Sequence, residues 1–393
     1  MKAREVTPKI QMLGAVDWNR TLFDALIPLP QGTSYNAYLV TGSQKTALID
    51  AADPSLQDQL MEQLVSIPRV DYIIAQHAEQ DHSGALPLVM AKYPGARLVC
   101  SQKASGMLQD LLDLPADRIQ VAADGETLSL GDLTLEFIYT PWVHWPETMC
   151  TYLKEEKTLF SCDFFGSHLA TSRVYAADDP AVYPAAKRYY AEIMMPFRVP
   201  IQKNLDRLAA FDIERIAPSH GPVYGAPLWI IDAYKEWVSA PPKNEVVIPY
   251  ISMHHSTEML VKRMTGALAE RGVGVKVFDL TVADIGELAM ALVDAATVVV
   301  GTPIMLGGPH PLVGYAINLA ALLKPKAKFA AFLVSYGWGA GAVERLPGLI
   351  EGLKVEALPP VVARGMPRQA EMEAVDALAD LIATKHRELG FRK

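Results

Sequence analysis

The chain has 393 residues, which is enough for two domains of ordinary size, and half of its residues are hydrophobic, which excludes a disordered or fibrous protein. Its formal net charge of −8, with no run of lysine or arginine, argues against nucleic acid or an anionic membrane as a partner. The three cysteines form no Cys-x-x-Cys pair, which argues against a zinc ribbon or an iron–sulfur cluster. Because the N-terminus also lacks a secretory signal, we expect a protein of the reducing cytoplasm.

A dense cluster of potential metal ligands follows the first clearly buried strand, which we expect at residues 72–76. The cluster contains His77, Glu79, Asp81 and His82. Side chains alternate in an extended segment, so we expect His77, Glu79 and Asp81 to share one side, while a turn brings His82 to a second metal ion. The alternative is an exposed helix N-terminus, but two histidines are uncommon in a charged first turn.

Three further candidate ligands come just past apolar strands. They are His144 after residues 135–139, Asp163 after residues 158–162, and His220 after residues 213–218. Taken singly, each is more often a hydrogen-bonded structural histidine or a turn aspartate. Together with the first cluster they supply four imidazoles and three carboxylates, which is enough for two metal ions and more than one zinc ion needs.

A domain boundary is expected at residues 239–244, where two prolines follow a helical stretch and a new apolar strand begins. We therefore predict domains at residues 1–243 and 244–393. The second half alternates short β-branched runs with amphipathic stretches in five βα units, which predicts a parallel sheet covered by helices on both faces. Residues 295–323 carry no charge, but Gly-Pro-rich positions interrupt them, so we expect strand, loop and helix rather than a membrane span.

Ligands of such sheets bind beyond the carboxyl ends of the strands, where three loops have unusual chemistry. These loops contain Ser252, Met253, His254, His255, Ser256 and Thr257; Thr302, Pro303, Ile304, Met305, Leu306 and Gly307; and Ser335, Tyr336, Gly337, Trp338 and Gly339. Hydroxyl groups and free N–H groups at a helix start suit a phosphate, and the chain has no dinucleotide or nucleoside triphosphate motif. Aromatic rings in the later loops could flank an isoalloxazine, so FMN is the predicted ligand, although receiver domains without flavin have loops in the same places.

Four segments of the first half resemble the motifs of flavodiiron proteins. They are His-x-Glu-x-Asp-His-Ser-Gly at 77–84, Thr-Pro-x-x-His-Trp-Pro at 140–146, Phe-Ser-x-Asp-x-Phe-Gly at 160–166 and Pro-Ser-His-Gly at 218–221. Residues 17–20, 32–36 and 335–339 and the Ser-x-x-x-Ser-Thr phosphate loop are also similar, so the likeness spans nearly the whole chain. The resemblance implies an α/β protein with a metallo-β-lactamase-like αββα sandwich followed by a flavodoxin-like, doubly wound parallel sheet.

The resemblance also implies a ligand assignment. One iron is bound by His77, Glu79 and His144, the other by Asp81, His82 and His220, and Asp163 bridges them. Glu79 stands where the general metallo-β-lactamase motif has histidine, and an anionic carboxylate helps to hold iron in its ferric state. The chain departs from many relatives at Cys162, where they have Asn, and at two spacer positions. His168 lies at a position from which it could orient Asp163, and the alternative is that it is an exposed surface histidine.

The activity implied by the resemblance is reduction of nitric oxide to nitrous oxide, of dioxygen to water, or both, at two non-haem irons that receive electrons from FMN. Flavin and iron pair together hold about four electrons, the number that dioxygen reduction consumes. The usual donor is a rubredoxin or another small electron carrier, and the usual assembly is a head-to-tail homodimer or a dimer of dimers. The alternatives are a dizinc hydrolase fused to a flavodoxin domain and a non-catalytic flavin carrier. Gas preference, donor, dimer or tetramer, and further roles of His254 and His255 stay open.

Overall fold

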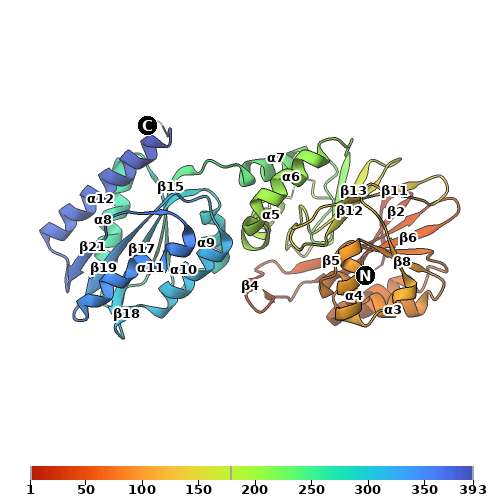
Figure 1. Ribbon diagram of the computed structural model, residues 1–393, viewed down its shortest axis with the longest axis horizontal. Helices are drawn as coiled ribbons and strands as arrows, with labels where there is room; N and C mark the ends of the chain where they lie inside the picture. Colours follow the sequence, from red (N-terminus) through yellow and green to blue (C-terminus); the bar gives the residue numbers. More distant parts are fainter. Residues whose placement is uncertain (1, 178, 392–393) are drawn as a thin grey trace. The chain divides into compact units, whose positions relative to one another are not determined.

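The computed structural model describes residues 2–177 and 179–391, and the chain divides into two compact units (Figure 1). The first unit comprises residues 1–190 and 197–238, and the second comprises residues 191–196 and 239–393. Across the described residues no helix is long and apolar enough to cross a membrane. The uncharged segment after Asp294 forms strand, loop and helix, as expected.

Two sheets lie face to face in the first unit. The larger sheet has the order β1 (Arg4–Thr7), β2 (Ile10–Asp17), β5 (Thr33–Thr41), β6 (Thr46–Ile49), β7 (Tyr72–Ala75), β8 (Arg97–Cys100) and β9 (Ile119–Val121). The smaller has the order β10 (Thr127–Ser129), β11 (Thr134–Tyr139), β12 (Met149–Leu153), β13 (Thr158–Cys162) and β14 (Arg215–Pro218). A short hairpin of β3 (Leu22–Phe23) and β4 (Ile27–Pro28) precedes β5.

Helices cover the outer face of each sheet. The larger sheet carries α1 (Gln57–Leu64), α2 (Gln80–Ser83), α3 (Leu86–Lys92) and α4 (Gln102–Leu112), and the smaller carries α5 (Val182–Tyr189), α6 (Arg198–Leu208) and α7 (Leu228–Val238) (Figure 1). Successive side chains of a strand point to opposite faces of its sheet, so each strand contributes to the core under the helices and to the core between the two sheets. In β6, Leu48 packs with the helix-side core, whereas its neighbour Ile49 packs in the core between the sheets with Phe137 and Phe160. This is the αββα sandwich expected from the sequence.

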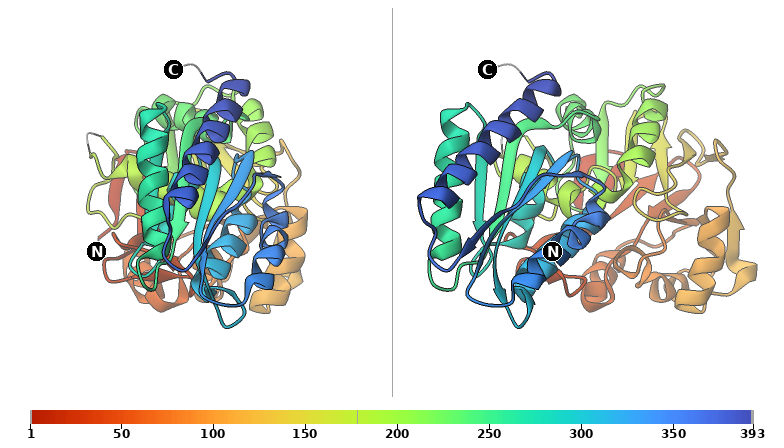
Figure 2. Two further views of the ribbon diagram at one scale, coloured as in Figure 1. Left: turned by 90° about the vertical axis from the view of Figure 1, so that its left-hand side faces the viewer. Right: turned by 60° about the vertical axis from the view of Figure 1, so that its left-hand side comes forward.

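The second unit is a parallel sheet with helices on both faces (Figure 2). Its strand order is β16 (Gly274–Asp279), β15 (Lys243–Tyr250), β17 (Ala295–Met305), β19 (Phe329–Tyr336) and β20 (Glu356–Ala357), with β21 (Val361–Arg364) also on β19 and β18 (Gly308–Pro309) on β17. The helices are α8 (Ser256–Glu270) and α12 (Gln369–Glu388) on one face, and α9 (Ile285–Leu292), α10 (Pro311–Leu323) and α11 (Leu346–Leu349) on the other. This order confirms the doubly wound fold.

The fifth strand of this sheet is not continuous. It is split into β20 and β21, which pair with opposite ends of β19. Two consecutive prolines, Pro359 and Pro360, separate the parts, and proline has no N–H group to donate to a neighbouring strand.

A glycine in β2 allows two strands to approach closely. Gly14 has a φ of +103°, and a Cβ atom there would lie 2.0 Å from the carbonyl oxygen of Tyr35. The side chain of buried Gln63 accepts from the Gly14 N–H (2.9 Å) and donates to its carbonyl oxygen (2.7 Å). The side-chain amide of Gln63 thereby fixes helix α1 to strand β2.

We predict that Gly14→Ala lowers the free energy of unfolding of the first unit by about 2–4 kcal/mol, because the methyl group forces β2 away from β5 and breaks both bonds to Gln63. Gly106→Ala is the matched control, since Gly106 lies in α4 with open space around its Cβ position, and there we expect a gain of up to about 1 kcal/mol. Urea denaturation of the three proteins measures both changes. Equal stabilities of Gly14→Ala and wild type would contradict the close approach.

Candidate metal centre and cofactor cavity

The candidate metal ligands follow the ends of four strands in the first unit. His77 and Glu79 lie in the loop after β7, His144 in the loop between β11 and β12, Asp163 directly after β13, and His220 directly after β14. The predicted alternation is wrong for Asp81. Helix α2 begins at Gln80, so Asp81 and His82 lie in a helical turn and not in the extended loop, and Asp81 faces a different group from His77 and Glu79.

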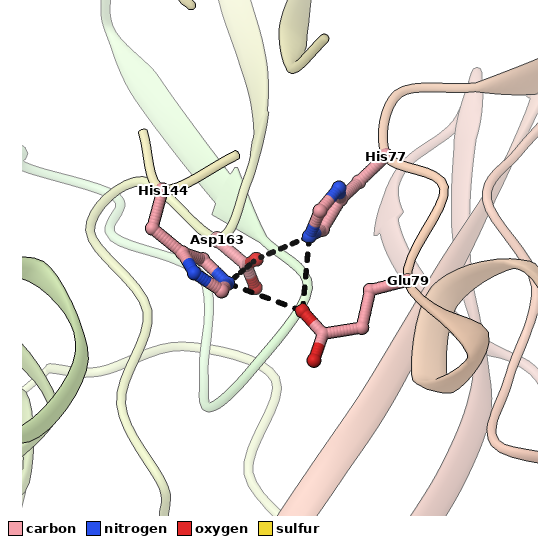
Figure 3. A group of neighbouring side chains, drawn as sticks. All are labelled: His77, Glu79, His144 and Asp163. Atoms are coloured by element: carbon pink, nitrogen blue, oxygen red, sulfur yellow. Dashed lines mark hydrogen bonds and ion pairs between the residues drawn. The ribbon is translucent and has the colours of Figure 1, made fainter. Parts of the chain in front are cut away.

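Two groups of side chains with metal-binding atoms result. The first consists of His77, Glu79, His144 and Asp163, which point toward one another (Figure 3). Glu79 Oε2 lies 3.1 Å from His77 Nε2 and 3.2 Å from His144 Nε2. Asp163 Oδ2 lies 3.4 Å and 3.3 Å from the same two nitrogen atoms.

The second group consists of Asp81, His82 and His220. Asp81 oxygens lie 3.3 Å from the Nε2 atoms of His82 and His220. The other oxygen of Asp163, Oδ1, lies 3.1 Å from His82 Nε2 and 3.2 Å from His220 Nε2. The two oxygens of one carboxylate are thus divided between the two groups, which is the arrangement of a bridging ligand.

These distances fit metal coordination. Two ligand atoms held about 2.1 Å from one ion at angles of about 90–109° lie about 3.0–3.4 Å apart, which is the spacing found in both groups. Several of the buried atoms have no hydrogen-bond partner, namely both carboxylate oxygens of Asp81, His82 Nε2 and Asp163 Oδ2. Buried polar atoms normally have partners, so atoms left without them that face a common point suit cations.

The outer nitrogens of three histidines are held by different groups. His77 Nδ1 donates to Glu147 Oε1 (2.6 Å), His220 Nδ1 donates to the carbonyl oxygen of Ser34 (2.7 Å), and His82 Nδ1 lies 3.8 Å from Cys162 Sγ. Such contacts place the proton of a neutral imidazole on Nδ1, which leaves Nε2 free to bind a cation. The sequence analysis missed Glu147, although an acidic residue at the start of the apolar strand β12 is a signal for a buried partner.

Two more residues lie directly behind the ligands. Tyr189 donates its hydroxyl hydrogen to Asp163 Oδ1 (2.8 Å), and burial raises the pKa of this phenol well above its usual range, so that it remains a donor. His168 is buried, with Nδ1 2.8 Å from Thr33 Oγ1 and its ring centroid 5.1 Å from that of His220. A surface location for His168 is therefore excluded. Gly221 permits close packing here, because its φ is +82° and a Cβ atom would lie 2.0 Å from Ser167 Oγ.

The carboxylates and imidazoles of this cluster shift one another's pKa values. Burial lowers the pKa of His144, but hydrogen bonds to Asp163 and Glu79 outweigh it and raise the pKa to about 9. Burial acts against His220 in the same way, and Asp163 and Asp81 raise its pKa to about 10. Burial raises the pKa of Asp163, yet the surrounding histidines hold it well below its usual range. Without metal ions, protons on the imidazoles balance the buried carboxylates.

The second unit contains a cavity of about 370 Å³ at the carboxyl ends of its strands. Nine predicted cofactor residues line it, namely Met253, His254, Ser256, Pro303, Ile304, Ser335, Tyr336, Gly337 and Trp338. The structure adds Gly365 and Met366 from the loop after β21, which the sequence analysis missed because five βα units alone do not indicate which loops converge. The volume lies in the usual range for small-molecule sites, roughly 300–1,000 Å³.

The other predicted cofactor residues lie around this cavity and do not line it. They are Ser252, His255, Thr257, Thr302, Met305, Leu306, Gly307 and Gly339. Ser252 Oγ accepts from the Glu258 N–H (3.2 Å), and Thr257 Oγ1 lies 2.8 Å from Ser335 Oγ, so both residues shape the start of α8. Leu306 and Gly307 form the tip of the β17–β18 hairpin. A helix start, hydroxyl groups and aromatic rings around one cavity fit a phosphate-bearing planar cofactor such as FMN.

Comparison with known proteins gives three findings of high coverage. A nitric oxide reductase of Moorella thermoacetica is 34% identical over 97% of this chain and 98% of its own length. A coenzyme F420H2 oxidase of Methanothermobacter marburgensis is 33% identical over 79% of this chain and 80% of its own length. The solved structure of rubredoxin oxygen:oxidoreductase from Desulfovibrio gigas covers 100% of both chains at 29% identity, with a TM-score of 0.95. The chain belongs to the flavodiiron family.

A match to the family described as "ODP family beta lactamase" covers residues 33–221, which include all seven candidate ligands of the flavodiiron chain. The three relatives are each named as a reductase, oxidase or oxidoreductase, and none is named as a hydrolase.

We predict that metal binding to the ion-free protein strengthens as the pH rises toward 9, because His144 and His220 must first lose protons. At pH 7, binding should release about two protons or more per chain, which anaerobic titration with Fe(II) in a weak buffer containing a pH indicator measures. Binding that is independent of pH between 6 and 9 would contradict these protonation states.

The protonation of His144 and His220 also predicts how the stability of the ion-free protein depends on pH. Both histidines have pKa values raised above the ordinary value of about 6.5, so their contribution to stability is fully present below that pH and is lost as pH rises through about 9 and 10. The ion-free protein should therefore unfold more easily at pH 10 than at pH 7 in urea. The iron-loaded protein is the control, because there cations replace the protons and the loss should be smaller.

Proposed function

We propose that this flavodiiron protein is an oxidoreductase that reduces nitric oxide to nitrous oxide, dioxygen to water, or both. The observation that carries the proposal is the carboxylate of Asp163, whose two oxygens are divided between two groups of metal-binding atoms. In this assignment His77, Glu79 and His144 hold one iron, Asp81, His82 and His220 hold the other, and Asp163 bridges them. The cavity of the second unit holds FMN.

The chain's own residues bind, orient and shield the cofactors. A pair of ferrous irons supplies the electrons and the positive charge that reduction of a diatomic gas requires, and FMN supplies further electrons. Glu147 and the Ser34 carbonyl fix the tautomers of His77 and His220, and Tyr189 holds one oxygen of the bridge. The hydroxyl of Tyr189 also places a proton next to Asp163 Oδ1, the carboxylate oxygen that faces His82 and His220.

A dizinc hydrolase is the alternative from another class, and two features weigh against it. Glu79 gives the first group an anionic ligand, so that two carboxylates and two imidazoles face one point, which favours iron over a histidine-rich zinc site. The cavity in the second unit would have no role in hydrolysis. The relatives' names point in the same direction.

Composition and single-turnover measurements test the proposal directly. Anaerobically purified protein should carry about two irons and about one FMN per chain. In anaerobic stopped-flow, protein with reduced flavin should be reoxidised by nitric oxide, by dioxygen, or by both, and the ratio of the two rates gives the preference. Stoichiometric zinc after growth in iron-replete medium, together with lactonase activity, would establish the hydrolase instead.

Asp163→Ala is predicted to lose paired iron and at least about 100-fold of turnover, because both metal groups lose an oxygen ligand while the second unit is untouched. FMN content should be unchanged. Asp132→Ala is the matched control, since Asp132 is an exposed acid of the first unit whose carboxylate accepts from Lys9 and from the Ser43 N–H. Iron analysis, Mössbauer spectra and turnover of both variants measure the effect, and normal iron pairing in Asp163→Ala would refute the bridge.

We also propose a rubredoxin or another small carrier as electron donor and the cytoplasm as location. The donor proposal follows the solved relative named for rubredoxin, while the coenzyme F420H2 oxidase names another donor to be tested in parallel. The location follows the three cysteines, which are buried and unpaired, as is usual in reducing compartments. Reduction of the flavin by each donor under anaerobic conditions decides between them.

For assembly we propose a head-to-tail homodimer, or a dimer of such dimers, in which the FMN of one chain serves the iron pair of its partner, with the predicted domains 1–243 and 244–393 acting separately. The short Pro241-Pro242 connection supports this, because a stiff linker restricts how far one chain can turn its own strand-end faces toward each other. A two-fold contact then gives two equivalent site pairs.

Subunit exchange tests this assembly. One chain carries His77→Ala and Asp163→Ala, and the other carries Ser252→Asp and Ser256→Asp, which repel a phosphate but leave the Thr257–Ser335 contact intact. If flavin and iron act across chains, random reassortment restores roughly a quarter of wild-type activity per chain. Action within one chain restores none. Mass spectrometry of the mixed dimers confirms that exchange has occurred.

A further inference from the structure

The three histidines with outer partners are held by acceptors of unequal strength. A carboxylate oxygen contacts His77 at 2.6 Å and a carbonyl oxygen contacts His220 at 2.7 Å, whereas a sulfur atom contacts His82 at 3.8 Å. An ionised carboxylate is a strong acceptor, a carbonyl oxygen is intermediate, and a thiol sulfur is weak. His82 is therefore the ligand with the weakest outer support among the three.

The sulfur belongs to Cys162, which is the last residue of β13 and directly precedes the candidate bridge Asp163. Cys162 is 1% exposed and has a φ of +52°, in the left-handed region where non-glycine residues other than Asn and Asp are uncommon. Its backbone is held by the Ser219 N–H, which donates to the Cys162 carbonyl oxygen at 2.9 Å. The position of the sulfur is thus set by the same turn that places Asp163.

A further cluster of buried side chains also includes His82. Atoms of Asp50, His82 and Cys162 lie within 4.8 Å of one another, on residues that are each at most 3% exposed. The carboxylate of Asp50 already accepts from the Gln76 N–H and the Gln76 side chain, both at 2.8 Å. For the described residues, the hydrogen-bond contact of His82 Nδ1 is the one to Cys162 Sγ at 3.8 Å, so the sulfur is the acceptor within reach of this nitrogen.

We propose that Cys162 is a positioning residue for His82: its sulfur accepts the Nδ1–H and keeps Nε2 as the nitrogen that faces Asp81 and Asp163. Through this contact Cys162 helps to retain the ion held by Asp81, His82 and His220. The inference rests on the proposed pair of metal ions and adds to it a residue that supports one of the two positions.

The test is release of iron from the intact, reduced protein to a ferrous chelator under anaerobic conditions. Wild type should lose its two irons in two phases of about one equivalent each. In Cys162→Ala the phase of the iron held by Asp81, His82 and His220, called here the His82 phase, should accelerate about threefold to tenfold, because the Nδ1–H loses its acceptor, while the other phase stays unchanged. Mössbauer spectra recorded after the first phase identify the iron that remains.

Cys150→Ala is the matched control, because Cys150 is also a buried cysteine of the smaller sheet. Its sulfur contacts Thr140 Oγ1 at 3.7 Å and the Ser161 carbonyl oxygen at 3.6 Å, and not a candidate ligand. Both phases should match wild type in this variant. An equal acceleration in Cys150→Ala and Cys162→Ala would assign the effect to lost packing and overturn the proposal.

Two further substitutions separate the acceptor from the backbone conformation. Asn tolerates the left-handed conformation and offers an amide oxygen, so Cys162→Asn should slow the His82 phase about threefold or more. Gly tolerates the same conformation but offers no acceptor, so Cys162→Gly should release iron as fast as Cys162→Ala. Similar rates for the Asn and Gly variants would show that backbone strain, and not the contact to His82, governs release.

Folding is checked by urea denaturation of each ion-free variant, and if Cys162→Ala does not fold, the Asn and wild-type proteins carry the comparison. A His82 phase in Cys162→Asn that equals or exceeds the wild-type rate would then refute the role of the sulfur. The same release is measured on Zn(II)-loaded protein. A wild type that holds no iron pair counts against the proposed function, and the zinc phases still decide the role of Cys162.

Discussion

The central physical constraint on this protein is the burial of three carboxylates and four imidazoles around two points. Asp163 is 1% exposed and has both oxygens close to histidine nitrogens, so its negative charge cannot be solvated by water. Such a set is stable only if positive charge fills it, either as protons on the histidines or as metal ions. The neighbouring turns, the αββα layers and the outer partners Glu147 and Ser34 all serve to keep these atoms close together.

The layers explain why so many ligands can come from distant parts of the chain. Strand ends of both sheets meet at one edge, and each ligand is the first or second residue past a strand or lies in the loop or the short helix α2 that follows one. The parallel sheet of the second unit and the ligand-bearing turns could therefore be predicted from alternating strand and helix patterns and from apolar runs followed by His, Asp or Glu, whereas the αββα sandwich was predicted from the resemblance to flavodiiron proteins. Periodicity could not locate the start of α2, and for that reason the side of Asp81 was predicted wrongly.

The residues that contact the candidate ligands from behind could not be predicted from the sequence, for a different reason. Tyr189, on α5, reaches Asp163 only because that helix packs against the smaller sheet, and no spacing along the chain indicates this contact. Gly365 and Met366 line the cofactor cavity because β21 pairs with the end of β19 after a proline interruption. In both cases the information lies in how layers are assembled, and sequence patterns describe one element at a time. The same limit applies to Cys162, whose sulfur lies behind His82 because of the turn after β13.

The glycines of the two units differ in what surrounds them, and this difference bears on how the protein can evolve. Around the metal ligands, a side chain on Gly221 would collide with Ser167, and one on Gly166 would lie 3.1 Å from both Asp163 and Tyr189. Around the cofactor cavity, Gly337 and Gly308 have no atom within 4 Å of a Cβ position. New side chains can therefore be added at Gly337 and Gly308 without repacking, whereas Gly221 and Gly166 beside the metal ligands leave no such room. Sequence variation should accumulate at such open positions, while the turns that carry the metal ligands change little.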